Sequence, residues 1–248
     1  MDPREYELMY CVEDQHWWYR GMESITCALI DDRIRPTSRL NILDAGCGTG
    51  AAMTTYLAEY GDVTGVDFHL QALEFCRKRN ARRLACASVL DLPFDSASFD
   101  LVTSFDVLYE RGVSSELTAL REFARVLTDA GRVLLRLPAY DWLRGEHDRR
   151  VHTNRRYTKR GVRSLLEESG FIVEHLSHAN MLLFPLAVIK RLGERIFHPR
   201  EGTSDLSLEV GILNPVFKFV LASEAPLVSR TGLPFGLSVV AIGRKRQA

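Results

Sequence analysis

Residues 42–50, Ile-Leu-Asp-Ala-Gly-Cys-Gly-Thr-Gly, constrain the fold more than any other stretch of the chain. An apolar run stops at Asp44, three glycines follow at every second position, and a helix-like run begins at Ala51. Glycine has no side chain and tolerates positive φ, so a ligand can lie against the bare backbone at the N-terminus of the helix. The pattern predicts a strand, a tight turn and a helix, arranged as a nucleotide-type binding loop.

The rest of the chain repeats this alternation of strand and helix. Further strands are predicted at 63–67, 84–87, 99–104, 131–137, 172–176 and 237–242, and helices at 51–59, at 69–78, before residue 127 and after Thr158. Such alternation is typical of a doubly wound, mostly parallel α/β sheet. Ligands of these sheets bind at the carboxyl ends of the strands, beside the switch point, which is where the glycine loop is expected.

Two segments depart from the alternation. Residues 1–38 contain His16-Trp17-Trp18-Tyr19-Arg20 and a helical stretch, and are predicted to form an N-terminal helical cover. Neighbours on a helix lie about 100° apart, so the two tryptophans cannot both face one core. One of them is expected to line a ligand site, and packing of both on the domain edge is the alternative. Residues 179–235, with five prolines, are predicted to be a helical cap inserted into a core of 39–178 and 236–248.

Charge and cysteine content exclude several classes of protein. Lys plus Arg and Asp plus Glu are equal at 32 each, so no overall field favours nucleic acid or an anionic membrane, although residues 144–163 hold eight basic residues against two acidic ones. The five cysteines form no Cys-x-x-Cys pair, and their odd number favours a reducing, cytoplasmic location.

Membrane and oligomer predictions rest on the apolar runs. We expect neither a signal peptide, because the first residues are charged, nor a transmembrane segment, because the longest apolar run, 181–189, is too short. That run is predicted to be a substrate lid, with a dimer interface or a weak contact with a membrane as alternatives. The chain is expected to be a monomer or a homodimer.

The glycine loop alone is compatible with two cofactors. Gly46-x-Gly48-x-x-Ala51 fits the dinucleotide pattern that accepts alanine at its third position, so a nicotinamide-dependent oxidoreductase is one interpretation. Asp67 ends the second predicted strand about 20 residues after the glycines, at the spacing where α/β nucleotide folds present a carboxylate to ribose hydroxyls.

Together with Asp44, Asp67 and the Leu92-Pro93-Phe94 loop before the strand at 99–104, the glycine loop resembles class I S-adenosylmethionine-dependent methyltransferases of the type 11 small-molecule group, over residues 40–138. The resemblance implies a Rossmann-like, doubly wound sheet of seven strands, mostly parallel with the last strand antiparallel. It implies S-adenosyl-L-methionine as cofactor, S-adenosyl-L-homocysteine as product, and methyl transfer to a small-molecule or lipid-like acceptor. A non-catalytic protein that binds this cofactor, or an interaction protein, is the alternative.

The resemblance also implies a role for each matching residue. The glycine loop would approach the methionine part of the cofactor, and Phe105 would lie near its sulfonium. Asp67 would accept hydrogen bonds from both ribose hydroxyls. Asp44 would support the loop, Phe68 would pack on adenine, and Ser88 and Val89 would edge its ring. The implied cofactor site is Asp44, Gly46, Cys47, Gly48, Asp67, Phe68, Ser88, Val89 and Phe105. The chain departs from the family at Ser88, where many relatives have an acid, and at Tyr109-Glu110, where they commonly have Glu-His.

A narrower resemblance, to a bacterial subgroup of these methyltransferases, lies in two segments, His16-Trp17-Trp18 and 147–157. It implies that both segments close over the cofactor. If the acceptor must lose a proton, the candidate bases are His147, His152, Tyr157 and Glu110. The alternative for the two histidines is a structural hydrogen-bond pair that anchors the loop, and for Tyr157 it is plain packing. Candidates for binding an apolar or anionic acceptor are Trp17, Trp18, Arg155 and Arg156. The acids and histidines lack metal-ligand spacing, so no metal is predicted.

Overall fold

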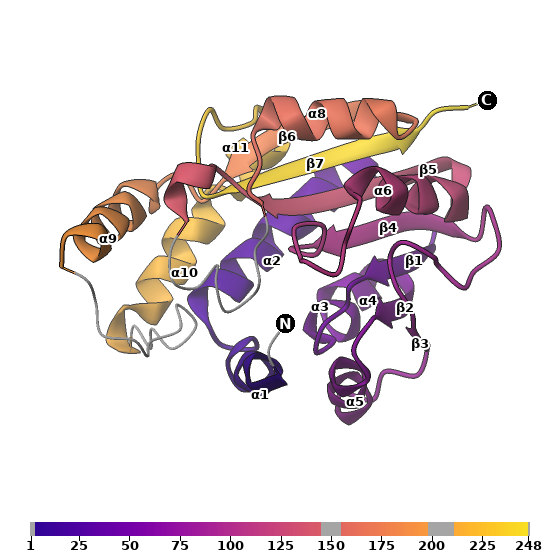
Figure 1. The fold of residues 1–248 in the computed structure, drawn as a ribbon, viewed down its shortest axis with the longest axis horizontal. Helices are drawn as coiled ribbons and strands as arrows, with labels where there is room; N and C mark the ends of the chain where they lie inside the picture. The colour runs from indigo at the N-terminus through magenta and orange to yellow at the C-terminus, as the bar shows by residue number, and fades with distance from the viewer. Residues whose placement is uncertain (1–2, 145–154, 198–210, 248) are drawn as a thin grey trace.

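The computed structural model describes residues 3–144, 155–197 and 211–247. Seven strands form one sheet in the order β3-β2-β1-β4-β5-β7-β6 (Figure 1). The strands are β1 (Leu40–Ala45), β2 (Gly61–Asp67), β3 (Leu84–Cys86), β4 (Phe99–Phe105), β5 (Leu127–Pro138), β6 (Phe171–Ala179) and β7 (Ser238–Lys245). Neighbours from β3 to β5 are parallel, and β7 runs antiparallel to both β5 and β6. The predicted fold class is confirmed, with its last strand antiparallel.

Helices cover both faces of the sheet because the strands are apolar on both sides. Leu43 of β1 belongs to the core that includes α6 (Glu116–Val126) and α8 (Lys159–Glu168), whereas its neighbour Ile42 belongs to the core that includes α2 (Trp17–Leu29). Alternate residues of a strand point to opposite faces, so this short run feeds two cores. The helix predicted after Thr158 is α8, and Thr158 caps it, because its hydroxyl accepts a hydrogen bond from the Gly161 amide at 3.1 Å.

The helix after the glycine loop differs from the single helix predicted at 51–59. It is divided into α3 (Ala51–Thr54) and α4 (Tyr56–Tyr60), and α5 (Leu70–Lys78) follows β2. The break falls at Thr55, whose hydroxyl donates to the carbonyl of Ala51, while the Thr54 hydroxyl donates to that of Gly50. Such bonds from threonine to the preceding turn compete with the helical ladder, which the apolar spacing does not reveal.

The first 38 residues contain α1 (Pro3–Val12), α2 and a π-helical turn at Ile30–Ile34, and α1 was not predicted. Between β6 and β7 lie α9 (Phe184–Phe197), the 3₁₀ turn η4 (Gly211–Leu213), α10 (Asn214–Ser223) and α11 (Ala225–Arg230). Figure 1 shows α9 and α10 at the left end of the molecule, beyond the edge of the sheet.

Among the described residues, one helical segment, Gly211–Arg230, is by length and composition apolar enough to cross a membrane. The apolar runs alone predicted no such segment. Its inner face is nevertheless part of the domain, because Leu221 and Val228 are fully buried against α2. The buried Glu224 carboxylate also accepts hydrogen bonds from the amides of Met181 and Leu182, at 3.1 and 2.8 Å.

Candidate active site

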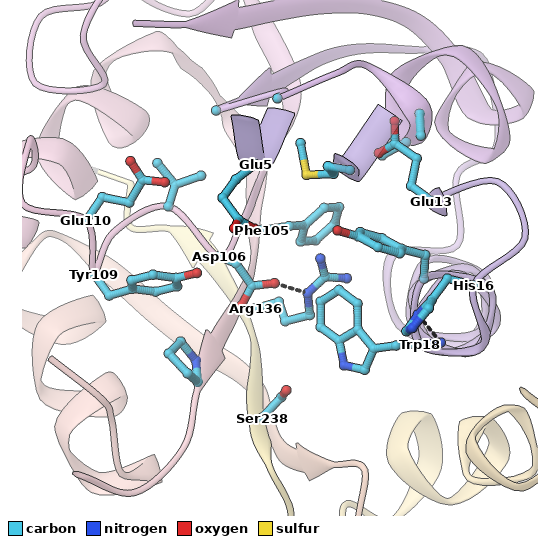
Figure 2. Close-up of a pocket in the computed structure, with 18 of the residues that line it drawn as sticks. Glu5, Glu13, His16, Trp18, Phe105, Asp106, Tyr109, Glu110, Arg136 and Ser238 are labelled. Carbon is cyan, nitrogen blue, oxygen red and sulfur yellow. Dashed lines mark hydrogen bonds and ion pairs between the residues drawn. The ribbon is translucent and has the colours of Figure 1, made fainter. Parts of the chain in front are cut away.

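A cavity of about 1130 Å³ lies at the carboxyl ends of β1, β2 and β4. β1 pairs with β2 on one side and with β4 on the other, so the strand order reverses beside it, as expected of a ligand-binding switch point. The wall is completed by α1 and α2 from the N-terminal segment and by α9 and α10 from the segment between β6 and β7. Figure 2 shows part of this wall, with Trp18, Phe105 and Arg136 close together.

The glycine loop curls back over the end of β2. The amides of Gly46 and Cys47 both donate to the carbonyl of Val66, at 2.8 and 2.9 Å. Gly46 has a φ of 84°, and a Cβ built on it would lie 2.2 Å from Cγ2 of Val107. Position 46 therefore excludes any side chain, and the loop presents its backbone to the cavity.

Asp67 stands at the end of β2 and is 8% exposed. Its Oδ2 accepts a hydrogen bond from the Gly48 amide at 3.0 Å, and its Oδ1 accepts one from the His69 amide at 2.9 Å. Burial raises the pKa of Asp67, and the two amide bonds oppose this rise. Because a carboxylate has about four lone-pair sites, it can bind two further donors from the cavity.

Asp44 is almost completely buried at the end of β1 and also lines the cavity. Its Oδ1 accepts from the hydroxyl of Thr103, at 2.8 Å, on the neighbouring strand. Burial raises the pKa of Asp44 to about 6, despite the opposing effects of the Thr103 hydrogen bond and of Arg136. The carboxyl group therefore ties β1 to β4 directly beneath the loop.

The remaining predicted cofactor residues line the same cavity, so the structure brings all nine together. Phe68 is 68% exposed at the rim, an apolar ring with room for a planar partner. Ser88 accepts from the Leu90 amide at 3.1 Å, beside the buried Val89. Cys47 is buried, and its contact with Cys76 together with burial raises the pKa of its thiol, which suits a small packing residue better than a nucleophile.

The central pair of the cavity, Arg136 and Asp106, is not among the residues predicted from the sequence. The Nε of Arg136 donates to Oδ2 of Asp106 at 2.6 Å, and the guanidinium lies 4.7 Å from the ring centroid of Trp18 and 4.8 Å from that of Phe105 (Figure 2). Asp106 has a φ of 61°, a strained conformation for a residue with a side chain. The signal was visible in the sequence, because Arg136 interrupts the apolar run 133–138 of β5.

A second missed residue, Glu13, links the N-terminal segment to the glycine loop. Its carboxylate accepts from the hydroxyl of Thr49 and from Arg79, the latter at 2.9 Å. Burial raises the pKa of Glu13 to about 7, against the effects of Thr49 and Arg79. The contact holds the end of α1 over the cavity.

Both tryptophans line the cavity, whereas the helical geometry predicted this for one of them. The ring of Trp17 packs against Phe217 of α10, with centroids 5.6 Å apart, while Trp18 packs on Arg136. Two elements therefore meet the adjacent rings: α10 faces Trp17, and the sheet faces Trp18. Each ring has its own partner, so the two need not share one core.

Residues 155–157 have different surroundings although they are adjacent. Arg156 lines the cavity, and its Nη1 donates to the Ala139 carbonyl at 3.0 Å. Arg155 is paired with Glu116, and Tyr157, only 6% exposed, donates from its hydroxyl to the same carboxylate at 3.1 Å. Tyr157 is not among the residues that line the cavity, and its hydroxyl is bonded to Glu116 of α6; its role as a base stays a prediction from the sequence.

Two other predicted bases, His147 and His152, lie outside the described residues. Glu110 lines the cavity, and burial raises its pKa to about 7. A carboxyl group with such a pKa can exchange a proton near neutral pH. Within the described ranges, no group of three or more His, Cys, Asp or Glu residues is arranged to hold a metal ion.

Comparisons with known proteins agree with this geometry. Residues 43–135, which contain the loop and the ends of β2 and β4, match a family model described as a methyltransferase domain. A demethylmenaquinone methyltransferase of Staphylococcus aureus strain MRSA252 is 36% identical over 102 residues, a match that spans 38% of this chain and 42% of the relative's length.

Similar solved structures cover nearly all of the chain. One, described as a methyltransferase and solved with the Trm112 methyltransferase activator of Haloferax volcanii, has a TM-score of 0.63 at 20% identity and covers 99% of this chain and 95% of that one. Geranyl diphosphate C-methyltransferase of Streptomyces coelicolor A3(2), solved with Mg²⁺, geranyl diphosphate and S-adenosyl-L-homocysteine, has a TM-score of 0.58 at 16% identity, over 88% of this chain and 76% of that one. At these identities the likeness shows the fold.

Proposed function

Because the chain carries a class I S-adenosylmethionine-dependent methyltransferase domain, we propose that it binds S-adenosyl-L-methionine in the cavity and transfers the methyl group to a small-molecule or lipid-like acceptor. The observation that carries the proposal is the placement of the Asp67 carboxylate against the Gly48 amide, at the switch point of the sheet. A buried carboxylate with free lone pairs therefore stands beside an open stretch of backbone, which supports a role in binding ribose hydroxyls.

The residues present fit the cofactor. Position 46 has no space for a Cβ, so the loop can approach the methionine part closely. Asp67 would bind the ribose with its free lone pairs, and the exposed ring of Phe68 would pack on adenine, whose edge would meet Ser88 and Val89. Asp44 would hold the loop through β1. When bound, the cofactor supplies an electrophilic methyl group.

The protein's own residues would then position the acceptor and exclude water. Trp18 and Phe105 fix Arg136 between them, so its orientation is set before any ligand enters. Where the accepting atom must lose a proton, Glu110 is the base that the geometry supports, because it lines the cavity and its pKa is about 7. His147 and His152 stay predictions from the sequence.

We take the part of the cavity that is lined by α9, α10 and Arg156 as the acceptor half, which would hold the acceptor. It combines apolar and basic side chains. The apolar residues are Leu183 from the turn before α9, Leu186 from α9 and Phe217 from α10. The basic residues are Arg156 and Lys190. This lining supports an acceptor with an apolar part and an anionic group. We further propose that the N-terminal segment is a cover and that 179–235 is a cap, in a monomer or homodimer in the cytoplasm, where the five free cysteines stay reduced.

Isothermal titration calorimetry with S-adenosyl-L-methionine and S-adenosyl-L-homocysteine tests the cofactor directly. We expect both to bind, and binding of neither would contradict the proposal. Reduced nicotinamide cofactor, followed by its fluorescence, is the comparison ligand and is expected not to bind. Consumption of the bound methyl donor with a library of apolar and anionic acceptors then separates a methyltransferase from a protein that only binds the cofactor.

A further inference from the structure

Two exposed apolar stripes run along α9 and α10, the helices that project beyond the sheet in Figure 1. The stripe of α9 begins in the turn before the helix and consists of Leu182, Pro185, Leu186 and Ile189; that of α10 begins in η4 and consists of Ile212, Pro215, Val216 and Phe219. Both follow the i, i+3, i+4, i+7 spacing of a single helix face. The side chains at the ends of the stripes are largely exposed: 67% for Ile189, 95% for Ile212 and 75% for Phe219. Hence each helix is apolar on its outer side as well as on its inner side.

The inner sides of the same helices form the cavity wall. Leu183 and Ala187 line the cavity from the α9 side, and Phe217 does so from α10. Leu186 and Leu213 line the cavity and are also 53% and 52% exposed. The cavity therefore reaches the surface on the side of the stripes, an opening called its mouth below, in addition to its rim at Phe68.

The charges and aromatic rings around the stripes are those of a surface that meets anionic lipid. By sequence, residues 182–197 and 211–223 hold four basic residues, Lys190, Arg191, Arg195 and Lys218, against one acid, Glu194. At the start of α9, the ring of Phe184 contacts those of Trp142 and Phe235, which are 50% and 41% exposed. Basic residues beside an apolar helix face attract anionic headgroups, and exposed aromatic rings favour the membrane interface.

We propose that α9 and α10 dock the protein on the surface of an anionic phospholipid membrane, with the two stripes in the interface. An acceptor with a lipid tail then enters the cavity from the membrane between Leu186 and Leu213. The second statement rests on the proposed function, whereas the docking surface does not.

Two features favour surface docking over other arrangements. The segment Gly211–Arg230 cannot cross the membrane without detaching from α2 and exposing Glu224. That side chain is fully buried and accepts hydrogen bonds from two backbone amides. A second copy of the chain seated on the stripes would close the mouth between Leu186 and Leu213. A lipid surface leaves that mouth facing the source of the acceptor.

Flotation of the full-length chain with vesicles of equal parts phosphatidylcholine and phosphatidylglycerol tests the docking surface. The variant Ile189→Asp/Phe219→Asp puts a charge into each stripe at exposed positions, and it is expected to reduce the vesicle-bound fraction about tenfold or more. The control is Leu70→Asp, at a residue 63% exposed in the first turn of α5, where an acid suits the helix N-terminus. It is expected to float like the wild type. Circular dichroism verifies that the variants are folded.

Failure of the wild type to float, or equal flotation of the double variant, would overturn the docking surface. A dimer in solution that the double variant dissociates, with no flotation, would also overturn it and assign the stripes to a second copy. Calorimetry with S-adenosyl-L-methionine on the same samples separates the two proposals. Flotation without cofactor binding contradicts only the proposed function, and cofactor binding without flotation contradicts only the docking surface.

Discussion

Arg136 and Asp106 bind each other twice at the carboxyl ends of β5 and β4. The Arg136 side chain donates to the Asp106 carboxylate at 2.6 Å, and the Asp106 amide donates to the Arg136 carbonyl at 2.9 Å. Burial alone would lower the pKa of Arg136, but the Asp106 carboxylate raises it, so the guanidinium stays charged. Because Trp18 stacks on that guanidinium, the pair joins the N-terminal segment to the sheet.

This arrangement predicts strong coupling between the two side chains. Arg136→Met leaves a carboxylate facing apolar rings, and we expect it to lower the free energy of unfolding by about 2 to 4 kcal/mol. The double variant Arg136→Met/Asp106→Asn is expected to lose about 1 to 3 kcal/mol less than the sum of the single variants. Urea unfolding measures the cycle. The control pair is Arg132 and Glu174, each 27% exposed, whose coupling is expected to be below about 1 kcal/mol. Equal coupling in both pairs would contradict the prediction.

The cofactor site predicts a loss of affinity in Asp67→Ala. Removal of an acceptor of charge-assisted hydrogen bonds is expected to weaken S-adenosyl-L-methionine binding by about 1 to 3 kcal/mol, roughly five- to 150-fold. Calorimetry measures the affinity. Asp62→Ala is the matched control on the same strand, because Asp62 is about half exposed and pairs with Arg39 and Arg83. Similar losses in the two variants would argue against a direct role for Asp67.

The glycine loop predicts that Gly46→Ala both destabilises the fold and closes the site. The new Cβ would meet Val107 and would hold a positive φ, which together are expected to cost about 2 to 4 kcal/mol of unfolding free energy. Thermal and urea unfolding measure the loss. Gly193→Ala in α9 is the control, because its Cβ meets nothing within 4 Å, and a small gain of up to about 1 kcal/mol is expected there. A Gly46→Ala variant as stable as the wild type would contradict this account of the loop.

The fold and the cofactor half of the cavity could be predicted because their determinants are local. The seven strands are short apolar stretches of sequence, and residues such as Asp44 and Asp67 lie at the ends of strands. The strand order brings these ends together without further information. The helix break at Thr55 was missed because it depends on hydroxyl bonds to the backbone, not on apolar spacing.

The acceptor half could not be predicted because its contacts join distant parts of the chain. The amide of Trp17 donates to Oδ1 of Asn214 at 2.8 Å, across 197 positions. The basic stretch around residue 155 likewise gives no sign that Glu116 would draw two side chains away from the cavity and leave Arg156 in its wall. The adjacent tryptophans, Arg156 and the arginine at position 136 in the apolar run of β5 are the sequence features that mark this region, without the contacts between them.

The position of Tyr157 predicts a structural role. Tyr157→Phe removes the hydroxyl that donates to Glu116, and we expect a loss of about 1 kcal/mol in unfolding free energy with unchanged affinity for S-adenosyl-L-methionine. Urea unfolding and calorimetry measure the two quantities. Tyr60→Phe, which removes an exposed bond to Asp31, is the control with a smaller expected loss. A Tyr157→Phe variant with normal stability but no affinity for S-adenosyl-L-methionine would instead indicate that Tyr157 acts in the site.

Asp44 predicts how the stability of the cofactor-free protein depends on pH. Its pKa of about 6 in the folded state is above the ordinary value of 3.8, so the folded state binds more protons between these values and stability falls as the pH rises through them. For Asp44 alone the loss between about pH 5 and about pH 8 is roughly 1 kcal/mol. Asp44→Asn keeps an acceptor for the Thr103 hydroxyl and does not titrate.

Urea unfolding at the two pH values gives the comparison. The stability of Asp44→Asn relative to the wild type is expected to increase by that roughly 1 kcal/mol on going from about pH 5 to about pH 8. Glu13 and Glu110, whose pKa values are also raised, contribute equally to both proteins and cancel in the difference. The exposed Asp62→Asn is the control and is expected to show no such change. A difference between Asp44→Asn and wild type that is independent of pH would mean that the Asp44 carboxyl group is already ionised at about pH 5, and that Thr103 and Arg136 outweigh its burial.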